Sequence, residues 1–260
     1  FIDRLIMIFT SMNGYDEFMA GAFWFFRGLL VASILFLVLF LLIDRRFHLQ
    51  PEKIALIICA AALAFTALRI GFNLKLRYIP NGGMREIWGL FFFALGFLFH
   101  RYEERIKVNL PMFMVFLALL CGAAWLHLSG MNNNGKIIDV LTLPITGAIG
   151  FLTVRYVAQH IDNKGHRLRD TLIFIGENTL YVFVFHIIAF KAVSLLKIWW
   201  YDLDFAQIGC HMVIHHNNHA DLFWIAYSIV GVALPLLWLK AWRKYVRIPS
   251  LAWSTALRKA

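Results

Sequence analysis

The chain contains seven apolar runs that are long enough to cross a membrane, with no soluble domain between them. A transmembrane helix needs about 20 apolar residues, because it rises about 1.5 Å per residue through a hydrocarbon core about 30 Å thick. The runs lie at 19–43, 54–72, 86–100, 110–129, 137–159, 171–197 and 222–242. Hydrophobic residues occupy 61% of the 260 positions, whereas a soluble domain has about 45–50%. Since lipid admits only helices and closed barrels, we expect an all-α polytopic membrane bundle of about seven transmembrane helices.

Basic residues are distributed unevenly between the two sides of such a bundle. Numbering the loops alternately places five of them on one side, namely Arg4, Lys75, Arg77, Arg85 and Lys136. Fourteen lie on the other side: Arg45, Arg46, Lys53, Arg101, Arg105, Lys107, Lys164, Arg167, Arg169, Arg243, Lys244, Arg247, Arg258 and Lys259. The positive-inside rule assigns the second side to the cytoplasm, together with the C-terminus. The net charge of +10 therefore reflects membrane topology, and we expect membrane lipid and no nucleic acid among the partners.

Three arginines are expected at the same outer depth of the first three spans. Arg27 lies near the outer end of the first span, close to Trp24, and Arg69 lies near the outer end of the second. Arg85 opens the third span, followed directly by an acidic residue. Converging guanidiniums can hold a carboxylate, a phosphate or a polarised carbonyl through forked hydrogen bonds. The alternative is that each long side chain extends to the headgroup region without a binding role.

The segment 175–186 (IGENTLYVFVFH) places a polar cluster and a histidine inside an apolar run. Lipid penalises polar groups, so each of these side chains needs a partner or a function. His186 is about fifteen residues into the span that begins near 171, which predicts a position past the midplane toward the outer leaflet. An imidazole there can serve as a general base or proton relay, or it can hold helices together as a neutral hydrogen-bonding group.

The expected extracytoplasmic loop at 198–221 is rich in histidine. Helical His215 and His219 would be four residues apart, but the loop lacks a recognised zinc spacing, so we predict no metal site. His216 and Asp221 match the H-x4-D pattern that activates hydroxyl groups in other acyltransferases, although four crowded histidines make a chance match easy. A polar loop facing the substrate is the preferred interpretation.

Several segments together resemble the membrane acyltransferase 3 family, and most closely its fucose 4-O-acetylase-like branch. The segment 176–186 matches the late helix of that family at Gly176, Asn178, Thr179, Leu180 and His186, and departs from it at Glu177, where the family often has Lys. The segments 21–26, 91–99 and 223–235 resemble other helices of the family, in the same order along the chain.

This resemblance implies a bundle of ten core spans with both termini in the cytoplasm. Removing the first three spans from such a bundle leaves seven, which start outside and end inside, as the charge distribution predicts for this chain. We therefore expect 1–260 to be a single, N-terminally truncated acyltransferase-like domain. The family carries its catalytic histidine in an Arg/Lys-x10-His motif on its first helix, of which we find no convincing copy here. The main catalytic histidine is therefore expected on a missing helix, with His186 in a supporting role, and the fragment alone is expected to be weak or inactive.

The resemblance further implies transfer of an acyl group, usually acetyl, from cytoplasmic acyl-CoA to a hydroxyl of a cell-surface glycan or its lipid-linked precursor, in the bacterial inner membrane. Arg27 and Arg69 are candidates for electrostatic stabilisation, and Trp24, Arg85, Asn178 and Thr179 for substrate binding. The cytoplasmic residues Arg45, Arg46, Arg101 and Arg105 are candidates for the phosphates of acetyl-CoA, with membrane topology as an equally good explanation.

Two other functions stay open from the sequence. A transporter or flippase could shelter a glycan or anionic substrate among the arginines, although we see no inverted repeat of the kind that such proteins often have. A non-catalytic membrane subunit is the third possibility. An upstream helix with the Arg/Lys-x10-His motif would favour the enzyme.

Overall fold

The computed structural model describes residues 24–74, 83–129, 136–164, 166–213 and 222–245. Every regular element within these ranges is a helix, which confirms the all-α prediction. The described residues form two compact units, one up to residue 164 and one from His166 onward. Each unit is described by itself.

Within the described residues, the first unit contains five α-helices, and its chain reversals follow from local sequence. They are α2 (Trp24–Phe47), α3 (Pro51–Gly71), α4 (Met84–Tyr102), α5 (Leu110–Trp125) and α6 (Asp139–Lys164), with a short 3₁₀ turn η2 (Glu103–Arg105) after α4. His48 ends α2 with a left-handed backbone (φ 49°), and a proline begins α3. Asn109 caps α5 by accepting a hydrogen bond from the Met112 amide at 3.0 Å.

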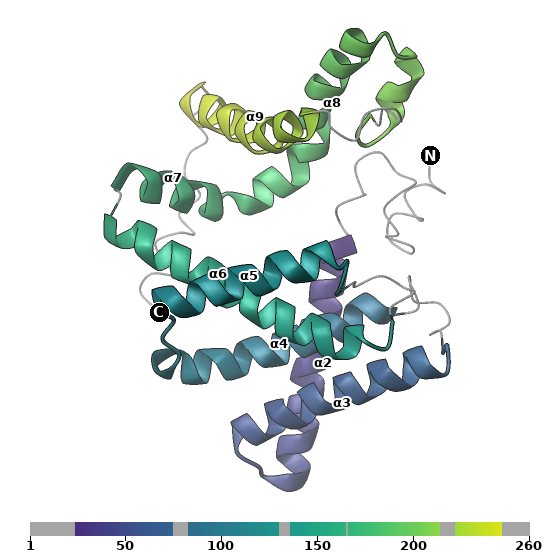
Figure 1. Cartoon of the computed structure of the whole chain (residues 1–260), viewed down its shortest axis with the longest axis vertical. Coiled ribbons are helices and arrows are strands. Elements are labelled where there is room, and N and C mark those ends of the chain that lie inside the picture. Colours follow the sequence, from purple (N-terminus) through teal and green to yellow (C-terminus); the bar gives the residue numbers. More distant parts are fainter. Residues whose placement is uncertain (1–23, 75–82, 130–135, 165, 214–221, 246–260) are drawn as a thin grey trace. The chain divides into compact units, whose positions relative to one another are not determined.

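The core of the first unit lies among α2, α3 and α4 (Figure 1). Small residues let these helices approach closely, as at Gly89 of α4, where an added Cβ would lie 3.1 Å from Ala32 of α2. Trp88 and Phe91 fill the space between the backbones, and both are buried. Because α3 reverses direction, the N-terminal ends of α2 and α4 lie together with the C-terminal end of α3. Residues that are distant in sequence therefore lie together at each end of this three-helix group.

The second unit contains α7 (His166–Glu177), α8 (Thr179–Tyr201), the 3₁₀ turn η3 (Phe205–Gly209) and α9 (Phe223–Tyr245). Helices α8 and α9 pack against each other, and Gly231 of α9 provides the room for Phe190 of α8. The single span expected at 171–197 is wrong, because the chain breaks between α7 and α8. The histidine-rich loop also starts later than predicted, since α8 continues to Tyr201.

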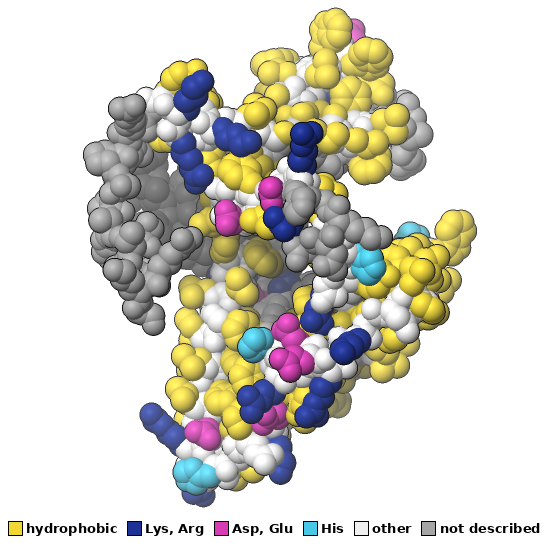
Figure 2. Space-filling model, turned by 90° about the vertical axis from the view of Figure 1, so that its left-hand side faces the viewer, with side chains coloured by type: hydrophobic (Ala, Val, Ile, Leu, Met, Phe, Trp, Pro, Cys, Tyr) yellow, Lys and Arg dark blue, Asp and Glu magenta, His cyan; other side chains and the backbone are white. Residues whose placement is uncertain are grey.

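Five of the described helices are long and apolar enough to span a membrane: α2, α3, α6, α8 and α9. Of the two other expected spans, α5 has only 16 residues, and α4 has 19 but carries Arg85, Glu86 and Arg101. Large apolar side chains cover much of the surface, and Figure 2 shows them as broad areas between groups of charged residues. Lipid tails satisfy such surfaces, so this exposure agrees with a membrane protein.

Candidate functional site

A buried ion pair joins the N-terminal ends of α2 and α4. A terminal nitrogen of Arg27 lies 2.6 Å from Oε1 of Glu86, and the side chains are 18% and 6% exposed. The other carboxylate oxygen, Oε2, is buried and has no hydrogen-bond partner among the described residues. A carboxylate can accept several hydrogen bonds, so Oε2 is available to a donor such as a hydroxyl group.

Arg69 joins this ion pair from the C-terminal end of α3. Its residue is 3% exposed, and its charge interacts with that of Glu86. The Nε atom of Arg69 donates to the carbonyl of Leu74 at 2.9 Å, which holds the chain as it leaves the helix. Arg27 and Arg69 therefore both interact with Glu86, and the catalytic roles predicted for the two arginines stay predictions. We name Arg27, Glu86 and Arg69 the arginine–glutamate cluster.

The other two residues predicted on this side are less defined. Arg85 is half-buried in the first turn of α4, next to Glu86, and its predicted binding role stays a prediction. Trp24 begins α2, but its side chain lies outside the described part. Glu86 was not singled out from the sequence, although a carboxylate at the start of a span beside two arginines of matching depth was the available signal.

The predicted donor-binding arginines gather at the opposite end of the same three helices. Arg45 and Arg46 lie exposed in the last turn of α2. Nε of Arg101, in the last turn of α4, lies 2.7 Å from Oε1 of Glu52 at the start of α3. The guanidinium carbon of Arg105, in η2, lies 5.7 Å from the centre of the Tyr102 ring. Along α2, Arg45 is 18 residues or about 27 Å from Arg27.

The segment that marks the family resemblance forms the break between α7 and α8 (Figure 1). The side-chain nitrogen of Asn178 donates to the carbonyl of Phe174 at 2.7 Å, and its oxygen accepts from Arg243 of α9 at 3.0 Å. The Thr179 hydroxyl lies 2.8 Å from the carbonyl of Gly176. Both side chains therefore serve the helix break, and their predicted contact with substrate stays a prediction.

Replacing Asn178 by alanine is expected to destabilise the second unit by about 1–3 kcal/mol. The change removes both side-chain hydrogen bonds and leaves buried polar groups without partners. Ser228→Ala is the matched control, because its exposed hydroxyl bonds only to a carbonyl of its own helix and should change stability by less than about 0.5 kcal/mol. Unfolding of the two purified variants in detergent measures the difference. Equal stability of both variants would contradict a role of Asn178 in stabilising the break between α7 and α8.

His186 lies in the first half of α8, and a backbone carbonyl determines which nitrogen of the neutral ring carries the proton. Its Nδ1 is 2.6 Å from the carbonyl oxygen of Phe183. A carbonyl can only accept, so Nδ1 carries the proton, and in the neutral ring Nε2 presents a lone pair. The ring is half-buried and lies edge-on to Phe190, with centroids 5.2 Å apart. This arrangement can accept a proton or a hydrogen bond at Nε2.

The break in the helix changes the expected depth of His186. The residue is seven positions after Thr179, which is about 10 Å along a helix of 23 residues. The prediction of fifteen residues into a continuous span is wrong because α7 and α8 are separate helices. His186 therefore lies nearer the middle of its membrane-spanning helix than to its C-terminal end.

The chain after α8 folds back along that helix. Nζ of Lys191 donates to the carbonyl oxygens of Ile208, at 2.8 Å, and Cys210. The Tyr227 hydroxyl accepts from the Val213 amide at 3.2 Å and bonds the Ser194 hydroxyl at 2.9 Å. Non-helical backbone at membrane depth needs such internal partners. Lys191 was not singled out from the sequence, although a lysine within an apolar helix was the available signal.

The metal and H-x4-D interpretations of the histidine-rich loop concern residues outside the described ranges. His215, His216, His219 and Asp221 all belong to 214–221. Within the described ranges, no group of three His, Cys, Asp or Glu residues has the geometry to hold a metal ion.

The protein is a polytopic membrane protein, because several of its helices are long and apolar enough to span a membrane. It also carries polar groups suited to binding or chemistry at membrane depth, namely the arginine–glutamate cluster and the imidazole of His186. Residues 7–242 match the family model described as an acyltransferase domain, that of the acyltransferase 3 family. The chain belongs to this family and is a membrane acyltransferase. Comparisons with curated proteins and with solved structures gave no match.

Proposed function

We propose that the protein transfers an acyl group, with acetyl as the preferred group, from acyl-CoA to a hydroxyl of a cell-surface glycan or its lipid-linked precursor. The family assignment supports acyl transfer. The single observation that carries the proposal is the hydrogen bond from His186 Nδ1 to Phe183, because it leaves Nε2 as a proton acceptor inside a membrane helix. Such a group can activate a hydroxyl.

The reaction forms a C–O bond and breaks a C–S bond. The acceptor hydroxyl donates its hydrogen bond to Nε2 of His186 and passes its proton there as the oxygen attacks the thioester carbonyl. Collapse of the tetrahedral intermediate gives the ester and a CoA thiolate, which takes up one proton. His186, which the sequence placed in a supporting role, is the proton acceptor in this proposal, and the expectation of a main catalytic histidine on another helix stays a prediction.

The arginine–glutamate cluster is proposed to bind the acceptor. Glu86 Oε2 is a buried acceptor atom that a sugar hydroxyl fits, since a hydroxyl can donate one hydrogen bond and still accept others. Arg27 pairs with the carboxylate at 2.6 Å, and Arg69 adds a second positive charge that interacts with it. The aligned hydroxyl groups of a glycan are the ligand chemistry that this cluster suits.

The opposite end of the first unit is proposed to bind the phosphates of the acyl donor. Arg45 and Arg46 are exposed, and guanidinium groups bind phosphate oxygens in a forked manner. Arg105 lies near the Tyr102 ring. Arg101 pairs with Glu52, so it can bind a phosphate only by giving up that carboxylate. The distance of about 27 Å along α2 supports separate ends for donor and acceptor.

Cell-surface glycan chemistry provides the first test. Cells lacking the gene should show fewer acetyl esters per glycan repeat by mass spectrometry, and the wild-type gene should restore them. A fall in the amount of surface glycan with an unchanged ester content per repeat would instead indicate transport. An unchanged amount and ester content would contradict glycan acetylation.

A further inference from the structure

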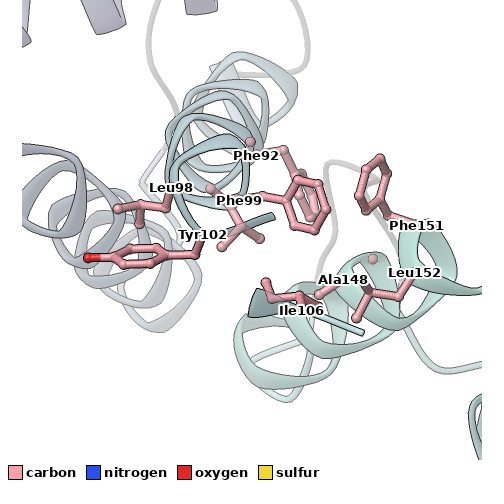
Figure 3. A pocket seen from close by; sticks show the side chains of 11 residues that line it. Phe92, Leu98, Phe99, Tyr102, Ile106, Ala148, Phe151 and Leu152 are labelled. Carbon is pink, nitrogen blue, oxygen red and sulfur yellow. The ribbon is translucent and has the colours of Figure 1, made fainter. Parts of the chain in front are cut away.

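An apolar pocket of about 520 Å³ lies between α4 and α6 in the first unit. Phe99 of α4 and Phe151 of α6 both line it and contact each other edge to face, with ring centres 4.8 Å apart, and Ala148 and Leu152 lie along the α6 side (Figure 3). The volume is within the range of about 300–1,000 Å³ that is usual for small-ligand sites. Neither the family assignment nor the proposed acyl transfer assigns a role to this pocket.

A positively charged side chain, that of Arg155, lies next to Phe99 of the pocket lining. The guanidinium carbon of Arg155 lies 5.0 Å from the centre of the Phe99 ring, one helical turn beyond Phe151. Its two terminal nitrogens lie 3.4 Å from the carbonyl oxygen of Ile106 and 3.4 Å from Oε1 of Glu103. Both distances exceed the usual 2.7–3.2 Å, so these bonds are weak and a stronger acceptor can replace them.

The pocket has the length and polarity of one lipid chain. On α4 its lining extends from Phe92 to Tyr102, ten residues or about 15 Å, which is half of a hydrocarbon core of about 30 Å. A peptide would leave backbone groups without hydrogen bonds in such a lining, at a large desolvation cost, whereas an acyl chain has none to satisfy. Two further basic residues, Arg105 and Lys107, follow α4 at the end of the pocket near Arg155.

We propose that this pocket binds one acyl chain of an anionic phospholipid, with the lipid phosphate on Arg155 in place of Glu103. Glu103 is 43% exposed, so it can turn into water when the phosphate binds. Phosphate offers Arg155 a forked, charge-assisted acceptor that the 3.4 Å contacts do not provide. Basic pockets between membrane helices on the cytoplasmic side are suited to acidic headgroups, and the charge asymmetry of the chain predicts that side for this end.

Lipid retention by the whole chain tests this proposal without relying on acyl transfer. The protein is placed in nanodiscs with spin-labelled phosphatidylglycerol or phosphatidylcholine of identical chains, and the motionally restricted fraction is measured. Wild-type protein should retain phosphatidylglycerol preferentially. Arg155→Gln should weaken that preference about tenfold, whereas Arg169→Gln, at an exposed ion pair of α7, should not change it.

A second pair of variants tests the pocket itself. Ala148→Phe fills the space beside Phe99 and should reduce retention of phosphatidylglycerol, whereas Ala60→Phe on an exposed face of α3 should not. Equal retention of both lipids by wild-type protein would overturn the proposal, and this comparison needs no variant. Wild-type retention in both Arg155→Gln and Ala148→Phe would also overturn it.

Discussion

Glu86→Ala is expected to lower the free energy of unfolding by about 3–5 kcal/mol. The substitution removes the carboxylate that pairs with part-buried Arg27 and interacts with buried Arg69. Breaking a buried ion pair on one side is costly because an uncompensated charge remains, far more so than the loss of an exposed pair. Unfolding of the purified protein in mixed detergent micelles measures the effect.

A double variant separates the contribution of the two charges from that of the side-chain volume. Arg27→Met with Glu86→Leu removes both charges of the 2.6 Å pair while keeping apolar volume, and it should recover much of the stability lost by Glu86→Ala. Glu104→Ala, at an exposed position in η2, is the control and should change stability by less than about 0.5 kcal/mol. Wild-type stability of Glu86→Ala would contradict the structural role of the cluster.

The ion pair also alters what is expected of Arg27→Ala. The sequence alone suggests a binding residue whose removal abolishes acetylation and leaves expression near normal. Because Arg27 neutralises Glu86, its removal should also destabilise the protein. Activity of that variant therefore needs normalisation to folded protein.

His186→Asn is expected to reduce acyl transfer by about 10²–10⁴-fold while the protein stays folded. Asparagine keeps an N–H near the position of Nδ1, so it can still donate to the Phe183 carbonyl, but it lacks the Nε2 lone pair. Loss of a general base typically costs a factor in this range. The initial rate of ester formation per folded protein measures the effect.

His100→Asn is the matched control for this substitution. Its side chain is 88% exposed at the end of α4, so the same chemical change should leave the rate unaltered. A wild-type rate for His186→Asn would exclude His186 as the proton acceptor. It would leave the imidazole with the purely structural role that the sequence also allowed.

The architecture was predictable where apolar length alone decides it. Runs of about 20 apolar residues define helices in any membrane protein, and each expected run contains a helix in the structure. The break at Asn178 was not predictable from length, because Leu172–Gly176 and Leu180–Phe185 are apolar on both sides of it. Side-chain bonds to carbonyls and to Arg243 of another helix determine the break, and these are tertiary contacts.

The candidate site was predictable in part. Matching depth at the helix ends placed Arg27 and Arg69 at the same end of the three helices, since α3 reverses between α2 and α4. The identity of their shared partner was missed, because Arg85 and Glu86 are adjacent and only the rotation of α4 determines which one faces the other helices. The contacts of Arg155 with Glu103 and Ile106 could not be predicted either, because they depend on packing that no spacing reveals.

Label transfer in proteoliposomes tests the acyltransferase proposal most directly. Purified protein is reconstituted with a glycan acceptor and acetyl-CoA that carries an isotopic label in its acetyl group, and the glycan is analysed by mass spectrometry. We expect label in ester linkage to glycan hydroxyls with wild-type protein, and a rate lower by about 10²–10⁴-fold with His186→Asn. Unlabelled glycan with folded wild-type protein would contradict it.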